Sequence, residues 1–253
     1  KAVNVQKDGS VMLGASTISG DVANSGHLTL GAATTVSGSI TNAGVLAVNG
    51  ETHAKDLTTT GTMTVGTDGV LAAENINVNG GTFTANGSVS STVKADKGGK
   101  AILKGKKTAL KGLVSGDQSS IEATLSGKDS ALNGSLDGAG SVTLSLIDQA
   151  NWTGNAVGNG TYAVTIGKDS TSLTLGGTWN NRGTSSLKQM AGNGGVIDMT
   201  DAKAGTVTIQ NYGGSSTYIY KHDTTKPADA NSGYAILGGD VKISQADKGS
   251  KIT

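Results

Sequence analysis

The fragments NSGHLTL (residues 24–30) and NAGVLAV (residues 42–48) share one pattern and begin 18 residues apart. Each has Asn, a small residue and Gly, followed by a short run with apolar residues at every second place. Such alternation is typical of a β-strand with one buried face. The separation is too long for a hairpin loop and too short for a second domain. The pattern therefore indicates a repeating unit that contains a short strand.

The unit recurs through the first 85 residues when the chain is aligned on its glycines. Gly9, Gly26, Gly44, Gly61 and Gly81 are separated by 17, 18, 17 and 20 residues. The second and fourth residues after each Gly are apolar. The second-place residues are Val11, Leu28, Leu46, Met63 and Phe83, and the fourth-place residues are Leu13, Leu30, Val48, Val65 and Ala85.

Short strands at this pitch, joined by Gly and Asn corners, predict an all-β fold of the parallel β-helix (β-solenoid) class with coils of 17 to 20 residues. Successive coils would pair about 4.8 Å apart, so that the five second-place residues form one interior column. A helical fold is excluded because no segment keeps a 3.6-residue apolar period, and each Gly costs about 1 kcal/mol relative to Ala inside a helix. A β-sandwich would not require this register.

Asn residues are expected at a common corner of the coils. Asn24, Asn42 and Asn79 stand two places before an aligned Gly, and Thr59 takes this place in the fourth coil. Stacked side-chain amides can bond one another along the axis, as in other stacked-strand structures. Alternatively, Asn is present simply because it tolerates turn conformations.

The composition fits a narrow core to which short strands contribute apolar side chains at regular intervals. Gly contributes 40 of 253 residues, Pro appears once, and the formal net charge is only +1, whereas disordered chains usually carry a high net charge. The absence of Cys excludes disulfides and thiolate metal sites. No apolar run is long enough to span a membrane as a helix. Both ends of the sequence look like cuts through a longer protein.

A succession of motifs in the second half points to a family. The segments are LIDQANWTGNA (146–156), LTLGGTWNNRGTSSLKQMAGNGGVIDMT (173–200), TVTIQNYGGSSTYIYKHD (206–223) and GGDVKISQADKGSKIT (238–253). Their order resembles the C-terminal part of the passenger domains of monomeric (type Va, pertactin-like) autotransporters of Gram-negative bacteria. The matching positions are Trp179, Gly194, Gly195, Val196, Ile197 and residues 211–214.

This resemblance implies a right-handed parallel β-helix at the cell surface, anchored to the outer membrane or released from it. A C-terminal translocator β-barrel, which lies outside this sequence, would display it. Residues 1–205 would form passenger coils with an insertion or loop at about 94–117. Residues 206–253 would form a C-terminal cap similar to the start of the family's autochaperone region, with a loop at 222–234. The implied partners are a receptor or glycan on host or bacterial cells, or a second copy of the chain.

Candidate catalytic groups are scattered along the sequence. The three histidines (His27, His53, His222) are far apart, and His27 is expected on the outside of its coil. Nucleophilic catalysis needs a nucleophile, a base and an orienting group held together, and no such set is visible. We expect no catalytic residues, metal or cofactor. The acids share no column and the only arginine is Arg182; the acids considered are Asp21, Glu51, Asp68, Glu74 and Glu122.

The strongest chemical asymmetry is the stretch KADKGGKAILKGKKTALK, where seven lysines accompany one acid, Asp96. A basic patch could attract acidic polysaccharide, lipopolysaccharide or nucleic acid, although no specific nucleic-acid partner is expected. The alternative is a solvated segment whose lysines discourage strand addition. The seven residues are Lys94, Lys97, Lys100, Lys104, Lys106, Lys107 and Lys111.

Outward-facing threonines form a second candidate surface. Thr side chains are good strand formers on a wet face, and regular Thr rows could also bind ice or a second copy of the chain. The rows consist of Thr29, Thr62, Thr64, Thr82 and Thr84. The sequence thus favours a non-enzymatic surface adhesin that mediates cell adhesion or autoaggregation. The alternatives are a carbohydrate-active β-helix, such as a polysaccharide lyase or tailspike-like depolymerase, and a purely structural spacer.

Deletion of residues 206–253 is expected to impair refolding of the remaining chain, because a solenoid needs a cap on its end coil. The measurement is the yield of β-structure by circular dichroism after dilution from urea. Equal yields for the full and shortened chains would remove the cap assignment.

Overall fold

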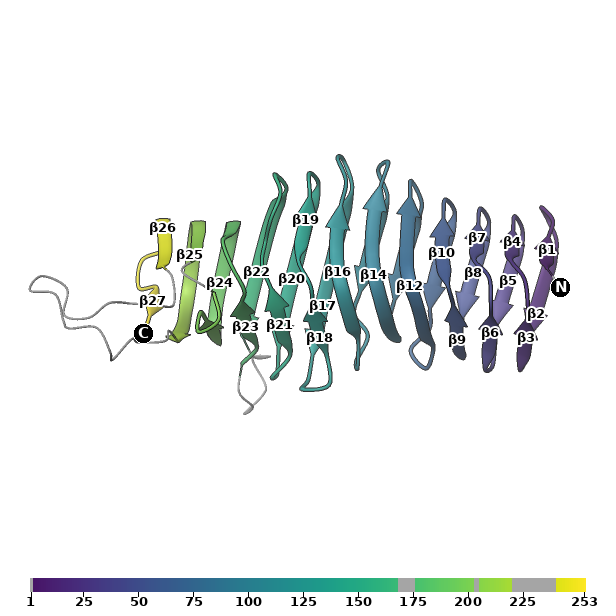
Figure 1. Cartoon of the computed structure of the whole chain (residues 1–253), viewed down its shortest axis with the longest axis horizontal. Coiled ribbons are helices and arrows are strands. Elements are labelled where there is room, and N and C mark those ends of the chain that lie inside the picture. Colours follow the sequence, from purple (N-terminus) through teal and green to yellow (C-terminus); the bar gives the residue numbers. More distant parts are fainter. Residues whose placement is uncertain (1, 168–175, 203–204, 220–239) are drawn as a thin grey trace, which may run out of the picture.

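The chain is a rod of stacked coils with its two ends at opposite ends of the rod (Figure 1). A computed structural model describes residues 2–167, 176–202, 205–219 and 240–253. Over these residues, 27 strands form one hydrogen-bonded sheet wound into a parallel β-solenoid of about 10 turns. The described part contains no helix, and so none that could cross a membrane. The predicted β-helix is confirmed, but coils in the second half exceed the expected 17 to 20 residues, as the pairing of Trp152 with Trp179 shows.

The strands lie on three faces, which follow one another in the order C, A, B along the chain; between β21 and β22, face C has only an isolated bridge at Ala156. Face A begins with short strands that pair in sequence order, β2 with β5, β5 with β8 and onward to β22. Its strands are β2 (Ser10–Leu13), β5 (His27–Leu30), β8 (Val45–Val48), β11 (Thr62–Val65), β13 (Thr82–Ala85), β15 (Lys100–Leu103), β17 (Ser120–Ser126), β20 (Ser141–Ile147) and β22 (Thr161–Gly167).

Faces B and C are separate at the start of the rod and share long strands in its middle. Face B consists of β3 (Ser16–Ile18), β6 (Thr34–Val36), β9 (Glu51–Ala54), β18 (Ala131–Asn133), β21 (Asn151–Gly154) and β23 (Thr178–Asn181). Face C consists of β1 (Val3–Val5), β4 (Val22–Asn24), β7 (Ile40–Asn42), β10 (Asp56–Thr59) and β19 (Leu136–Gly138). Strands β12 (Val70–Asn79), β14 (Ser88–Asp96) and β16 (Ala109–Ser115) cross from face B to face C.

The last strands of the described chain continue the stack. Strand β24 (Ser185–Asp198) pairs with both β22 and β23, and β25 (Thr206–Ile219) lies along β24. Strand β25 in turn pairs with β26 (Asp240–Ala246) and β27 (Lys251–Ile252). The division of the chain at residue 205 stays a prediction, and the predicted loop at 222–234 lies outside the described residues.

The interior of face A is a continuous apolar column. The register pairs Val11 with Leu28, Leu28 with Leu46, Leu46 with Met63, and Met63 with Phe83. Leu28, Leu46, Met63 and Phe83 are at most 1 % exposed, and Val11 is half-buried in the first coil. The column continues from Phe83 to Ala101 and on to Ile121, Val142 and Tyr162. This column is one part of a continuous core, to which Leu30 and Val48 on face A and Ile40 on face C also contribute buried side chains.

The repeated Gly lies at the corner between faces C and A, where the backbones of consecutive coils are in close contact. The amide of Val45 donates to the carbonyl oxygen of Gly26 at 2.8 Å. A Cβ added to Gly44 would lie only 2.1 Å from that same oxygen, and a Cβ on Gly61 would lie 2.2 Å from the oxygen of Gly44. These glycines are needed for close approach of the backbones rather than for an unusual φ.

A ladder of buried polar side chains runs beside this corner. The side-chain amide of Asn24 donates to Asn42 Oδ1 at 2.7 Å, and Asn42 Nδ2 donates to Thr59 Oγ1 at 2.9 Å. All three residues are at most 1 % exposed. The ladder is confirmed for these three, but the inclusion of Asn79 was wrong because Val78 follows Thr59 in the register. The corner of the fifth coil contains one additional residue, Gly80, which moves Asn79 out of the column.

The segment at 94–117 differs from the expected insertion. Strand β15 pairs with β13 and β17, and β16 pairs with β14, so this stretch is a full coil within the stack. The sequence spacing of the repeated glycines becomes irregular here because the corners are longer. Residues 97–99 join β14 to β15, and residues 104–108 join β15 to β16. Longer corners change the sequence period without interrupting the pairing.

Two tryptophans fill the interior under face B near the C-terminal part of the rod. Trp152 and Trp179 occupy consecutive coils with parallel rings whose centroids are 4.6 Å apart. Both are fully buried, and their ring N–H groups donate to the carbonyl oxygens of Gly134 (2.8 Å) and Gly154 (3.0 Å). The Trp-containing motifs in the sequence therefore act in packing.

Replacement of Gly44 by Ala should destabilise the rod by about 1–3 kcal/mol, because the added methyl group would force two backbones apart. Gly14→Ala is the matched control, since its Cβ would meet no atom within 4 Å. The control should be neutral or stabilising by up to about 1 kcal/mol. Urea unfolding followed by circular dichroism measures both variants. Equal effects of the two substitutions would contradict the close-approach explanation.

Candidate functional site

The seven lysines of the basic stretch encircle one coil and do not form a single patch. Lys94 lies on face C, Lys97 at the next corner and Lys100 on face A. Lys104, Lys106 and Lys107 lie at the corner between faces A and B, and Lys111 lies beyond it in β16. All seven are exposed. The lysines are spread around the rod because Lys94 pairs with Val114 of the next coil, so that residues 94–111 make almost one complete turn.

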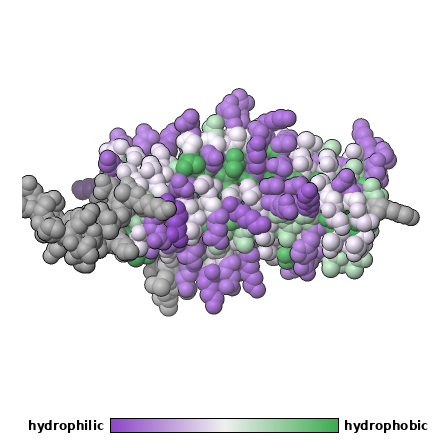
Figure 2. Space-filling view, in the orientation of Figure 1, coloured by the Kyte–Doolittle hydropathy of each residue, from purple (hydrophilic) through white to green (hydrophobic). Residues whose placement is uncertain are grey.

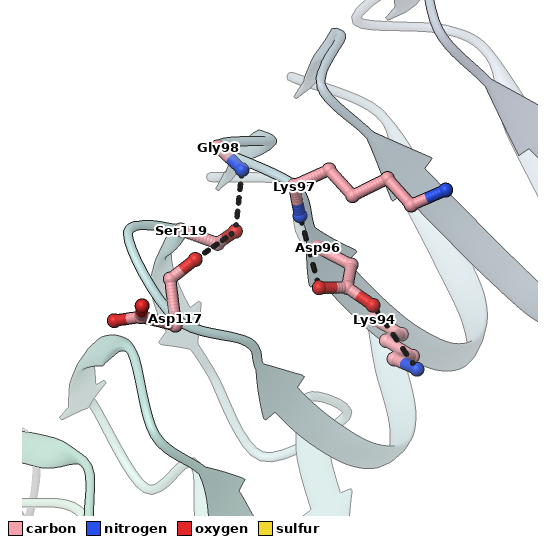
Figure 3. A network of polar contacts seen from close by, with 6 residues as sticks. All are labelled: Lys94, Asp96, Lys97, Gly98, Asp117 and Ser119. Atoms are coloured by element: carbon pink, nitrogen blue, oxygen red, sulfur yellow. Dashed lines mark hydrogen bonds and ion pairs between the residues drawn. The ribbon is translucent and has the colours of Figure 1, made fainter.

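The first lysines are engaged by local polar contacts (Figure 3). Lys94 Nζ lies 3.5 Å from Asp96 Oδ2, and the Lys97 backbone N–H donates to Asp96 Oδ1 at 2.9 Å. The hydrogen bond from the Lys97 N–H is the main cause that lowers the pKa of Asp96, and the positive charges of Lys94 and Lys97 lower it further. The stabilisation by this group is therefore present above the usual Asp pKa and is lost as the pH falls through the lowered value.

The corner at residues 97–99 is also hydrogen-bonded to the following coil. The Gly98 N–H donates to Ser119 Oγ at 3.1 Å, and Ser119 Oγ donates to the carbonyl oxygen of Asp117 at 3.3 Å. Figure 3 shows the Lys97 side chain running away from Asp96, so this lysine contributes charge at the edge of the rod and no second ion pair to Asp96. The network stabilises the corner.

Two further lysines are separated from this network. Lys100 Nζ lies 3.7 Å from Glu122 Oε1 on face A. Lys111 borders a surface hollow of about 200 Å³ that also includes His53, Glu74 and Ser90. His53 Nε2 lies 2.9 Å from Glu51 Oε1 in an exposed pair. These groups lie on different faces from the rest of the basic stretch.

The remaining three lysines line a larger notch of about 370 Å³ at the corner between faces A and B. The notch arises from corner length. Only residues 86–87 join β13 to β14, whereas residues 66–69 join the strands of the coil before and residues 104–108 those of the coil after. A short corner between two longer ones leaves a gap between them. Its lining residues are Thr67, Asp68, Gly69, Val70, Asn86, Ser88, Lys104, Lys106 and Lys107.

The lysine-bearing turn is held in place by its neighbours. Ser88 Oγ donates to the carbonyl oxygen of Lys107 at 2.8 Å, and the Thr108 hydroxyl donates to the carbonyl oxygen of Gly105 at 3.0 Å. Lys107 has a φ of 55°, in the left-handed region that non-glycine residues seldom occupy. The local structure thus keeps the backbone of this turn in one conformation.

The first five coils of face A carry no Asp, Glu, Lys or Arg on their outward side. We call this surface the threonine face; its residues are Ser10, Met12, His27, Thr29, Val45, Ala47, Thr62, Thr64, Thr82 and Thr84. Met12 is 77 % exposed and Val45 38 %. His27 is exposed, as predicted. In one view of the rod, apolar side chains form only small, separated patches among neutral and hydrophilic ones (Figure 2).

Two features of these sites were missed by sequence reasoning. The Lys segment was interpreted as a patch because its members are adjacent in sequence, although it turns around the whole rod. Asp68, Asn86 and Ser88 were not connected with it, because they lie in earlier coils. The lengths of successive corners carry the signal that could have located the notch.

Acidic and imidazole groups do not gather elsewhere in the part of the chain described by the structure. No group of three or more His, Asp or Glu residues there has the geometry to hold a metal ion. Arg182 forms an exposed ion pair with Asp201, and Asp21 Oδ1 accepts from the Ser39 N–H at 2.8 Å. Both contacts join neighbouring coils.

No protein-family model, curated protein or solved structure matches this chain. Membership of the autotransporter family therefore stays a prediction. The β-helix fold is shared by adhesin passengers and carbohydrate-active enzymes, so the fold by itself does not select a function.

Lys107→Gly should stabilise the chain by about 0.5–1 kcal/mol, because Gly adopts the observed φ without the steric cost borne by a side chain. Lys106→Gly is the control at a neighbouring exposed position whose φ is not positive. It should be destabilising, because the added freedom of Gly favours the unfolded chain. Thermal unfolding of both variants gives the comparison. A loss of stability in Lys107→Gly would show that the turn has another conformation.

Proposed function

We propose that this chain is part of a non-enzymatic adhesin at the cell surface, in which a rigid β-solenoid presents an extended side surface to other cells. The observation that carries the proposal is the threonine face, an uncharged outward surface that continues over five coils. Its location at the surface of a Gram-negative cell follows from the resemblance to autotransporter passengers.

The threonine face is suited to contact with another flat surface. Rows of Thr, Ser and Ala leave few long side chains to immobilise on binding, which lowers the entropic cost of association. Exposed Met12 and Val45 add apolar contact area. The face ends where the Lys100–Glu122 ion pair introduces charge on the same strands. Individually weak contacts would then add up over several coils.

A second copy of the chain is the partner that fits this face best. Both copies have the same spacing of about 4.8 Å between successive strands. Rows such as Thr62–Thr82 on one rod would therefore remain aligned with rows on the other over many coils. A repeated surface of this kind would produce cell–cell aggregation when displayed on bacteria.

A carbohydrate-active enzyme is the second candidate, because the same fold occurs in that class. It would require acidic and basic groups held close to a bound sugar. His53 and Glu51 form the only described His–carboxylate pair, and both are exposed. Digestion assays on acidic polysaccharides distinguish the two candidates, since an adhesin leaves the chain length of the polymer unchanged.

Introduction of two lysines, Thr62→Lys with Thr82→Lys, should abolish aggregation of cells that display the chain, because like charges would then face one another across the contact. Aggregation is measured as the settling rate of the displaying cells.

The matched control is Thr35→Lys with Thr41→Lys. Both residues are also exposed Thr on strands, but they lie on faces B and C. The control should settle like the unmodified chain. Equal loss in both variants would mean that net charge, rather than the threonine face, governs aggregation.

A further inference from the structure

We propose that the notch between residues 66–69 and 104–108 is a binding site for one acidic sugar residue of a polysaccharide, either a uronate or a sulfated sugar. This inference concerns a discrete ligand and does not rest on self-association through the threonine face. The notch lies at a corner of the rod, whereas the threonine face is on its side.

The size of the notch suits a monosaccharide unit. Its volume of about 370 Å³ is at the lower end of the range of about 300–1,000 Å³ for small-molecule sites. The walls are the two longer corners and the floor is the short corner at Asn86. Because three successive coils form it, the site depends on the stacking and is absent from any single repeat.

The charges of the notch favour an anion. Lys104, Lys106 and Lys107 form no ion pair with any described residue, whereas Lys94 and Lys100 each have an acidic partner. Positive charges without partners, placed on one concave surface, raise the local concentration of anions. Among the seven lysines, these are the three that share one concavity.

The other lining groups favour a sugar over a bare anion. Asp68 has a carboxylate that can accept hydrogen bonds from sugar hydroxyls, and Asn86 offers both an acceptor and a donor. An acid in the same notch as the three lysines would weaken the binding of phosphate or sulfate alone. For a ligand that combines hydroxyl groups with one charge, both kinds of protein group are used.

Nucleic acid fits this surface less well. No aromatic side chain lines the notch, so unpaired bases would have no stacking partner there. We therefore assign the site to acidic polysaccharide.

The test measures binding of the purified chain to polygalacturonate, dextran sulfate and neutral dextran by calorimetry at about 0.15 M salt, where long-range attraction is screened. Binding to polygalacturonate identifies a uronate site, and binding to dextran sulfate identifies a sulfated-sugar site. Neutral dextran should not bind. Failure of both acidic polymers to bind would overturn the assignment but leave the aggregation proposal intact.

The charge arm compares Lys104→Gln/Lys106→Gln/Lys107→Gln with Lys94→Gln/Lys97→Gln/Lys111→Gln, which removes the same charge at other positions on the rod. The notch variant should raise the Kd by about tenfold or more, and the control should change it by about twofold or less. Gln is compatible with the turn, since Gln118 occupies a similar φ of 58° in the chain. Equal weakening in both variants would overturn the proposal.

The decisive arm is Asp68→Asn, because two explanations predict opposite signs. If the surface attracts polyanions only through net charge, removal of an acid tightens binding. If Asp68 accepts hydrogen bonds from the sugar, the same change weakens binding by about threefold or more. Tighter binding would overturn the site. Binding of a duplex DNA oligonucleotide with the same dependence on the three lysines would also overturn it.

Discussion

The constraint that governs this molecule is that each coil of the backbone stacks on the previous coil at a constant short distance. At the corner between faces C and A, the oxygen of Gly26 accepts a hydrogen bond from Val45 N–H and leaves no room for a Cβ on Gly44. Because all strand pairs are parallel, residues at equivalent places in successive coils must lie one above another. The chain therefore has to supply compatible side chains at each place, coil after coil.

Inside the rod, this requirement is met in two chemically different ways. The apolar column tolerates exchange between Leu, Met and Phe because dispersion contacts do not depend on direction. The polar ladder of Asn24, Asn42 and Thr59 is directional, and it ends where Val78 enters the column. An apolar neighbour above Thr59 is acceptable, because Thr59 Oγ1 already accepts from Asn42 below. Such replacements allow the repeat to vary in sequence while the distance between stacked coils is preserved.

On the outside, the same stacking separates two kinds of surface. The faces stack outward side chains in rows from coil to coil and produce broad surfaces such as the threonine face. The corners vary in length, because a longer turn projects into solvent without disturbing the strands. The notch at Asn86 is a product of that variation, since it combines a short corner with two long ones. Extended contact and discrete binding can therefore coexist on one rod.

Over the first five coils, the sequence by itself determined the strands, their spacing and the interior column, since these follow from apolar alternation and Gly spacing, which are local properties. Beyond them it predicted an insertion at 94–117, where the structure has a full coil. It also indicated the polar ladder, with one error at Asn79 caused by the additional Gly80. Only the tertiary structure decided which side chains meet on the surface. Lys94 and Lys111 are near in sequence but lie on different faces, while Asp68 and Lys106 are distant in sequence and line one notch. The reason is physical: because one coil takes 17 or more residues, sequence neighbours are dispersed around the rod, and stacking brings together residues one or two coils apart.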